Sequence, residues 1–162
     1  MKLTRGELER NSNGLYSDQI ENILNQKGYY INGVFSKDKL PKDLKDGWYV
    51  MNLQNSNEGG GTHWTCFKSI NGSKIIEYFD AMGFSPPLEV YERAKGDILY
   101  SERQIQDINA TTCGWFCIAA IVCDKGYETP KSHFDKFINM FSNNTHINDK
   151  ILSKYFTSKG IQ

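Results

Sequence analysis

The chain has 162 residues with 39% hydrophobic content, 19 basic and 19 acidic side chains, and a formal net charge of +0. A chain of this length can bury roughly 70% of the surface that its unfolded form exposes, so we expect one domain over residues 1–162. The balanced charge argues against a dedicated nucleic-acid binder, and no apolar run is long enough to predict a signal peptide or a membrane span. We therefore expect a protein that is not secreted, with its 4 cysteines reduced.

The N-terminal part predicts one helix and then a loop. Ser17 is a suitable N-cap, and the helical pattern ends near Gly28. The apolar positions at helical spacing are Ile20, Ile23 and Leu24. We expect the range 29–40 to be irregular.

The middle of the chain predicts a β-sheet. Three runs rich in β-branched and aromatic residues indicate strands, and two shorter runs could be further strands. The three runs are 48–53, 63–70 and 74–80, and the shorter ones are 98–100 and 104–108. The run Gly59-Gly60-Gly61 forms a flexible approach to the second strand.

The C-terminal part predicts helices. Residues 113–123, CGWFCIAAIVC, are apolar or small on every side, which is typical of a fully buried helix. The ranges 130–141 and 148–156 predict amphipathic helices packed outside. The fold class we expect is α+β, with a mixed twisted sheet packed on a buried central helix and with outer helices.

One hairpin turn predicts which residues face each other. Asn71-Gly72 is the strongest short signal for a two-residue type I′ turn. Counting outward from that turn along an uninterrupted ladder places His63 directly opposite Asp80, with their Cβ atoms about 5 Å apart. The same register places Trp64 opposite Phe79 on the other face, so a histidine–carboxylate pair is predicted at the end of the hairpin.

Cys113 is the candidate nucleophile. Thr111 or Thr112 is a suitable N-cap, which places Cys113 in the first turn of the buried helix. The helix dipole and a nearby imidazolium favour thiolate there. Gly114 leaves room for a substrate backbone.

The other cysteines predict packing rather than chemistry. Cys117 and Cys123 lie on the apolar helix, and Cys66 is predicted to point away from His63. A zinc site built from the helix cysteines lacks the ordinary two-residue spacing, so we expect no metal.

An attacking thiolate creates an oxyanion that needs hydrogen-bond donors. The backbone N–H of Cys113 is one candidate. The side-chain amides of Gln104, Gln106 and Asn109 are all candidates for the second donor, and the residue chemistry alone does not choose among them.

These motifs resemble those of the adenovirus-type maturation proteases, relatives of the SUMO-specific proteases that also occur in virophages and other double-stranded DNA viruses. GGGTHW around His63, YFDAMGFSPP around Asp80, an upstream Gln106 and CGWFC at Cys113 follow the family's order from about residue 31 to 124. The resemblance implies a Cys-His-Asp triad with Gln106 in the oxyanion hole. It also implies that Trp64 is the aromatic residue after the catalytic histidine.

The resemblance further implies a thiol endopeptidase of the adenain-like fold. Its substrates would be capsid or other structural precursors cut after small or Gly residues, in the host cytoplasm, the virus factory or the virion. Gly60 and Gly61 would flank the substrate cleft together with Trp64 and Gly114. Because residues 87–103 contain no Cys, we expect no disulfide-linked peptide cofactor, and because the net charge is zero, we expect no strong nucleic-acid partner. We also expect no membrane partner and a monomer.

Other functions use some of the same residues. The triad also suits a deubiquitinase, a SUMO-type isopeptidase or an acyltransferase, and a papain-like order would pair Cys113 with His146 and Asp149. Outside enzymes, an inactive module could use the cleft to bind Gly-rich tails.

Overall fold

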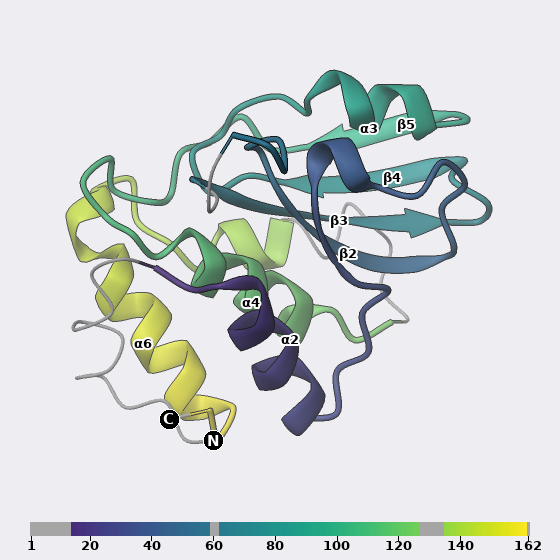
Figure 1. Cartoon of the computed structure of the whole chain (residues 1–162). Coiled ribbons are helices and arrows are strands. Elements are labelled where there is room, and N and C mark those ends of the chain that lie inside the picture. Colours follow the sequence, from purple (N-terminus) through teal and green to yellow (C-terminus); the bar gives the residue numbers. More distant parts are fainter. Residues whose placement is uncertain (1–13, 59–61, 127–134, 162) are drawn as a thin grey trace.

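The computed structural model describes residues 14–58, 62–126 and 135–161, and its centre is a mixed five-stranded sheet in the order β1-β2-β3-β4-β5 (Figure 1). The strands are β1 Val34–Ser36, β2 Gly47–Asn52, β3 Trp64–Ile70, β4 Ile75–Phe79 and β5 Asp97–Tyr100. The three central strands are antiparallel neighbours, whereas β1 and β5 join the edges in parallel. The α+β class that the sequence predicts is confirmed.

Side-chain alternation gives the sheet two buried faces. In β2, Trp48 and Val50 pack in the core beneath the sheet, while Tyr49 and Met51 pack in a smaller cluster on the opposite face. The larger core contains residues of α2 (Ser17–Gln26), α4 (Cys113–Cys123) and α6 (Asn148–Ser158). The smaller one lies under α3 (Leu88–Arg93), so Figure 1 shows helices on both sides of the strands.

The predicted central helix is confirmed with the bounds that the sequence indicated. All residues of α4, from Cys113 to Cys123, are buried. In Figure 1 this helix lies between the sheet and the outer helices. A segment without a polar face is stable as a helix only when neighbours cover it all round, which explains its central place.

Several local expectations were wrong at the residue level. The N-cap of α2 is Tyr16 rather than Ser17. The range 29–40 is not wholly irregular, because Val34–Ser36 forms the edge strand β1 through long-range pairing with β2. The range 104–108 is not a strand, since the N–H groups of Ile105 and Gln106 both donate to one carbonyl, that of Ala81.

The outer helices agree with the sequence in part, because α6 is confirmed whereas residues 139–141 of the other predicted helix are not helical. The helix α6 covers the predicted range 148–156 and continues to Ser158. In the predicted range 130–141, residues 135–138 are helical and residues 130–134 lie outside the described residues.

The predicted register of the β3–β4 hairpin was wrong by two residues. Ile70 pairs with Ile75 and Cys66 with Phe79, so the turn spans Asn71 to Lys74 rather than two residues. The backbone is left-handed at Asn71, Gly72 and also Ser73, with φ of 53°, 62° and 65°. The buried Ser73 hydroxyl lies 2.7 Å from that of Ser69, a contact that favours the longer turn over the tight one.

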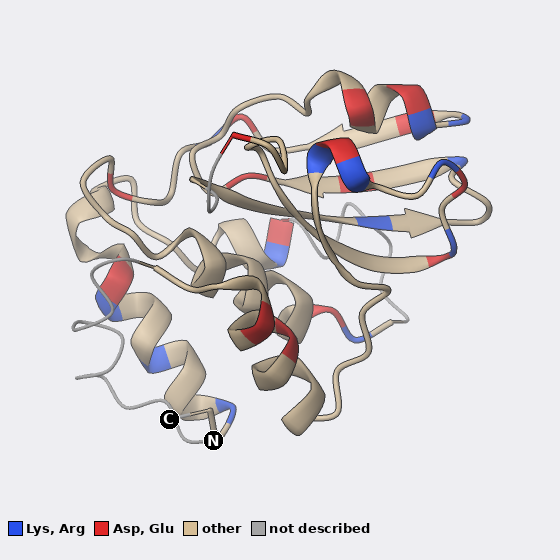
Figure 2. Cartoon of the chain, in the orientation of Figure 1, with Lys and Arg blue, Asp and Glu red and all other residues tan. Residues whose placement is uncertain are grey.

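Charged residues of both signs are interspersed on this fold. Figure 2 shows blue and red segments side by side on α3 and near the ends of the strands. Across the described ranges, no helix has the length and hydrophobicity needed to cross a bilayer.

Candidate active site

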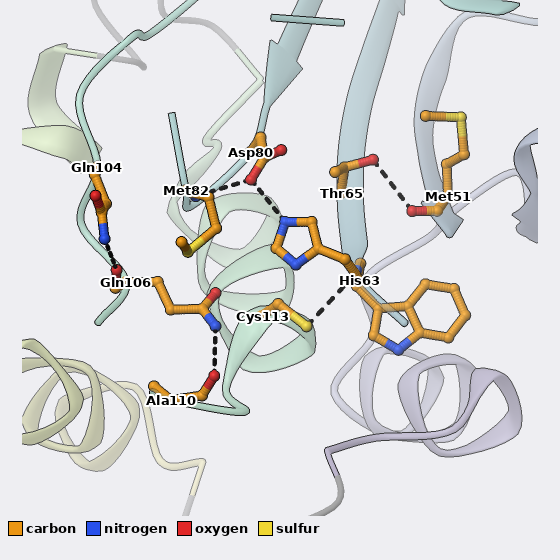
Figure 3. A network of polar contacts seen from close by, with 10 residues as sticks. Met51, His63, Thr65, Asp80, Met82, Gln104, Gln106, Ala110 and Cys113 are labelled. Atoms are coloured by element: carbon orange, nitrogen blue, oxygen red, sulfur yellow. Dashed lines mark hydrogen bonds and ion pairs between the residues drawn. The ribbon is translucent and has the colours of Figure 1, made fainter. Parts of the chain in front are cut away.

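Three elements bring the predicted triad together at one end of the sheet. His63 immediately precedes β3, Asp80 immediately follows β4, and Cys113 is the first residue of α4. Figure 3 shows the His63 ring between the Asp80 carboxylate and the Cys113 sulfur. The juxtaposition that the sequence predicted is therefore present.

The His63–Asp80 contact is short and shielded from water. His63 Nε2 lies 2.7 Å from Asp80 Oδ1, which also accepts a hydrogen bond of 2.8 Å from the Met82 N–H. The Asp80 side chain is fully buried, while the His63 side chain is 20% exposed. Asp80 therefore fixes the ring orientation while one side of His63 stays open to the surface.

This pair forms even though the predicted register was wrong. A shift of two residues preserves the face on which each side chain lies, whereas a shift of one would reverse it. His63 and Asp80 both lie beyond the last ladder pair, that of Cys66 and Phe79. Diagonal neighbours at such a strand end lie within reach of long side chains, so His63 still meets Asp80.

The environment of Cys113 favours thiolate. Burial alone would raise the pKa of the Cys113 thiol, but hydrogen bonds from the His63 ring and from the backbone N–H groups of Trp64 and Gly114 lower it below its ordinary value. The Trp64 N–H lies 3.4 Å from the sulfur. These donors stabilise negative charge at the start of α4, where the helix dipole acts in the same direction.

The environment of His63 favours imidazolium. Burial lowers its pKa, but the hydrogen bonds to Asp80 and to Cys113 outweigh that effect and raise the pKa of His63 to about 9. The cysteine and histidine pKa values thus move in opposite directions from their ordinary values. Both shifts favour the charge-separated state, in which Cys113 is a thiolate and His63 an imidazolium.

Gln106 is the one of the three amide candidates that lines the same cavity as His63 and Cys113. It is 3% exposed, and its Nε2 donates to the Ala110 carbonyl at 3.0 Å. An amide nitrogen carries two hydrogens, so this bond leaves Gln106 a second donor. Gln104 instead donates to the Gln106 carbonyl, and Asn109 does not line the cavity in the described part of the chain.

The cavity at this site is small, about 150 Å³. Its walls include short side chains and backbone from three separate parts of the chain. The described lining residues are Gly14, Leu15, Tyr16, Thr62, His63, Trp64, Gln106, Ala110, Thr111 and Cys113. Residues 14–16 are far from the triad in the chain and carry no motif, so sequence reasoning missed them.

The predicted cleft residues have different places. Trp64 lines the cavity, and its Nε1 donates to the Leu15 carbonyl at 2.8 Å. Gly114 is not one of the described residues that line the cavity. A Cβ at Gly114 would lie 3.3 Å from atoms of Leu15 and Trp64, so its missing side chain makes room for these two residues rather than for a substrate. Gly60 and Gly61 lie outside the described residues.

Within the described residues, the other cysteines and His146 do not join the triad. Cys117 is fully buried. Cys66 lies on the side of the sheet that faces Cys117, with its sulfur 4.0 Å from the Cys117 carbonyl. His146, the base of the papain-like alternative, is 78% exposed and lies 2.7 Å from Asp107. Within residues 14–58, 62–126 and 135–161, no group of three His, Cys, Asp or Glu side chains could hold a metal ion.

A larger cavity of about 660 Å³ lies away from the triad, between β5 and residues 135–139. Its described lining includes the carboxylates of Glu102 and Asp135 but no cysteine or histidine. Volume alone would point to this cavity. The juxtaposed thiol, imidazole and carboxylate side chains point to the smaller one.

Comparison with known proteins gives no relative from which a function could be transferred: no protein-family model and no curated protein matches this chain.

Proposed function

We propose that this chain is a cysteine endopeptidase of the adenovirus maturation type. The observation that carries the proposal is the continuous chain of contacts from Asp80 through His63 to the Cys113 thiol at the start of a buried helix. A nucleophile, a base within hydrogen-bond reach and a third group that orients the base are the components of covalent acyl transfer.

The proposed mechanism begins from a Cys113 thiolate beside a protonated His63, the charge state that both pKa shifts favour. The Cys113 thiolate attacks the peptide carbonyl, and the backbone N–H of Cys113 and the free N–H of Gln106 stabilise the oxyanion. His63 donates its proton to the leaving amine, so the peptide bond breaks and a thioester forms. His63 then withdraws a proton from water, which hydrolyses the thioester and regenerates the thiolate, while Asp80 keeps the ring in place.

The size of the cavity supports a small residue next to the cleaved bond. Its volume is about 150 Å³, and its lining includes Gly14, which has no side chain, and the small residues Thr62, Ala110 and Thr111. Larger substrate side chains would have to displace backbone. This supports cleavage after Gly. We further propose that the substrates are capsid or other structural precursors, processed in the host cytoplasm, the virus factory or the virion.

The first experiment is active-site labelling combined with cleavage. A thiol-reactive Gly-Gly peptide probe should modify Cys113 in the wild-type chain and not in His63→Ala, with the modified residue identified by mass spectrometry. A Gly-containing peptide reporter should be cut by the same preparation. Rapid labelling without cleavage of any peptide would contradict the proposal and favour a binding module.

Substrate profiling then separates the proposed endopeptidase from the isopeptidases. Ubiquitin and SUMO derivatives carrying a fluorogenic C-terminal amide are to be compared with internal Gly-containing peptides. We expect the internal peptides to have the higher kcat/KM. Preference for the ubiquitin or SUMO derivative would replace the maturation-protease proposal with a deubiquitinase or SUMO-type isopeptidase.

A further inference from the structure

The loop that carries Gln106 and ends at Cys113 contacts a single turn of the C-terminal region. This loop, residues 105–112, is the stretch that must hold an oxyanion donor and a nucleophile at a fixed distance. In Figure 1 it runs beside the yellow turn that begins α6. The turn consists of residues 145–149, from the 3-10 helix Thr145–Ile147 to the first residues of α6.

Asn148 holds the beginning of the loop. It is fully buried, and its Nδ2 donates to the Ile105 carbonyl at 2.7 Å. The same side chain bonds Ser142 twice, donating to its carbonyl at 2.9 Å and accepting from its N–H at 2.8 Å. All of these are buried or partly buried bonds that fix the residue directly before Gln106.

Asp149 holds the end of the loop. Thr112 takes the N-cap position of α4 but makes no side-chain capping bond. Its hydroxyl instead donates to Asp149 Oδ1 at 2.8 Å. Thr112 is 5% exposed and directly precedes Cys113, so this bond links the first turn of α6 to the residue before the nucleophile.

The middle of the loop is held at its surface. Asp107 Oδ2 lies 2.7 Å from His146 Nδ1 and accepts a hydrogen bond of 3.2 Å from the Thr145 hydroxyl. The His146 side chain is 78% exposed, so this contact contributes less than the buried ones. The loop is therefore held mainly by the buried hydrogen bonds of Asn148 and Asp149 at its two ends.

We propose that Asn148 and Asp149 are positioning residues that set the oxyanion donor Gln106 and the nucleophile Cys113 at their working distance. Neither residue lines the catalytic cavity in the described part of the chain, so they act through Ile105 and Thr112. The inference depends on the proposed function for its cleavage readout and is independent of it for its thiol-reactivity readout.

The test at the nucleophile end uses Asp149 and Thr112. Asp149→Leu removes the acceptor of the Thr112 hydroxyl, whereas Asp149→Asn keeps an oxygen in its place. In the same way Thr112→Val removes the hydroxyl and Thr112→Ser keeps it. The readout is the rate at which iodoacetamide alkylates Cys113 as a function of pH, followed by peptide mapping.

We expect Asp149→Leu and Thr112→Val to shift the Cys113 profile to higher pH by about one unit, which lowers the thiolate fraction about tenfold at pH values below the Cys113 pKa. Asp149→Asn and Thr112→Ser should stay close to the wild type. Leu152→Val is the matched control, because it shortens a fully buried side chain of α6 and leaves every hydrogen bond between α6 and the loop in place. It should lower the Tm and leave the profile in place.

The test at the oxyanion end is a double-mutant cycle. If Asn148 acts through Gln106, then Asn148→Ala should lower kcat with little change in KM in the wild-type background. It should have a much smaller effect in a Gln106→Ala background. An equal effect in both backgrounds would show that Asn148 is structural only.

Two further results would overturn the inference at the nucleophile end. One is an unchanged alkylation profile in both Asp149→Leu and Thr112→Val, and the other is a Leu152→Val control that shifts the profile as much as they do. Failure of the proposed function looks different. In that case the wild-type Cys113 is alkylated selectively and responds to the variants, but no peptide is cleaved.

Discussion

Two thiols one helical turn apart in α4 have opposite chemical characters. Cys113 is 7% exposed and Cys117 is fully buried, so both are shielded from water. The pKa of the Cys113 thiol is lowered, whereas burial, followed by the neighbouring Cys66 thiol, raises that of Cys117. Similar burial therefore does not produce similar reactivity.

The difference comes from the donors around each sulfur. Cys113 lies at the N-terminus of the helix, where backbone N–H groups are free to point at it, and it faces the His63 ring. Cys117 lies one turn further on, where the backbone N–H groups are occupied by the helix itself. The comparison shows that the end of a buried helix, rather than its interior, can stabilise a thiolate.

The largest expected effect separates the two thiols directly. Cys113→Ala should lower kcat by about 10⁶-fold, because the nucleophile is lost. Cys117→Ala should leave kcat within a few-fold and lower the Tm by about 2–4 °C, as expected for a loss of about 1 kcal/mol in a chain of this size. Kinetics with a Gly-containing reporter and thermal melts measure both.

The assignment of Cys113 as the nucleophile would be wrong if the activities of the two variants were reversed. A Cys117→Ala chain that folds but cannot cleave, beside an active Cys113→Ala chain, would assign the nucleophile to the interior of α4.

The second prediction removes the anion behind the histidine. Asp80→Asn should lower kcat by about 10⁴-fold, because the amide no longer stabilises the imidazolium. The pKa of His63 should fall from about 9. Catalysis needs the protonated ring and the thiolate together, so the alkaline fall in rate near pH 9 should move to lower pH. A pH–rate profile measures this shift.

In Asp80→Asn the pKa of the Cys113 thiol should rise, as the pKa of the buried Cys117 thiol does. The alkylation profile of Cys113 should move to higher pH, because a less basic His63 stabilises thiolate less. If neither the alkaline fall of the cleavage rate nor the alkylation profile of Cys113 moved, Asp80 would not act on the His63–Cys113 pair.

The third prediction separates reactivity from transition-state stabilisation. Gln106→Ala should lower kcat by about 100-fold or more, because one oxyanion donor is removed. The alkylation profile of Cys113 should not move, since Gln106 does not contribute to the pKa shift of that thiol. Gln104→Ala is the matched control and should keep most of the activity. If Gln104→Ala were the more damaging change, the oxyanion assignment would be wrong.

The smallest expected effect concerns the residue beside the nucleophile. Gly114→Ala adds a Cβ 3.3 Å from atoms of Leu15 and Trp64, so these side chains must move by a few tenths of an ångström. The gain in helix propensity is about 1 kcal/mol and offsets that strain. We expect a change in the free energy of unfolding below about 1 kcal/mol and a few-fold loss of kcat through Trp64.

Thermal melts and steady-state kinetics of Gly114→Ala test this balance. A loss of activity as large as that of Gln106→Ala would show that Gly114 borders the substrate after all, as the sequence suggested.

The sequence determined the parts of this protein that local patterns control. The apolar run of α4 fixes both its bounds and its central place, because a helix without a polar face has to be surrounded. The alternation in β3 and β4 fixes which side chains share a face, and this was enough to bring His63 to Asp80 although the turn was misread.

Only the tertiary structure decided the register, the edge strand β1 and the walls of the site. The turn from Asn71 to Lys74 depends on the buried Ser69–Ser73 contact, and β1 depends on pairing with β2. The approach of Gly14–Tyr16 to the cavity joins distant segments, as does the bond between Thr112 and Asp149. Such contacts leave no periodic pattern in the chain, because they depend on how finished elements pack rather than on the residues next to them.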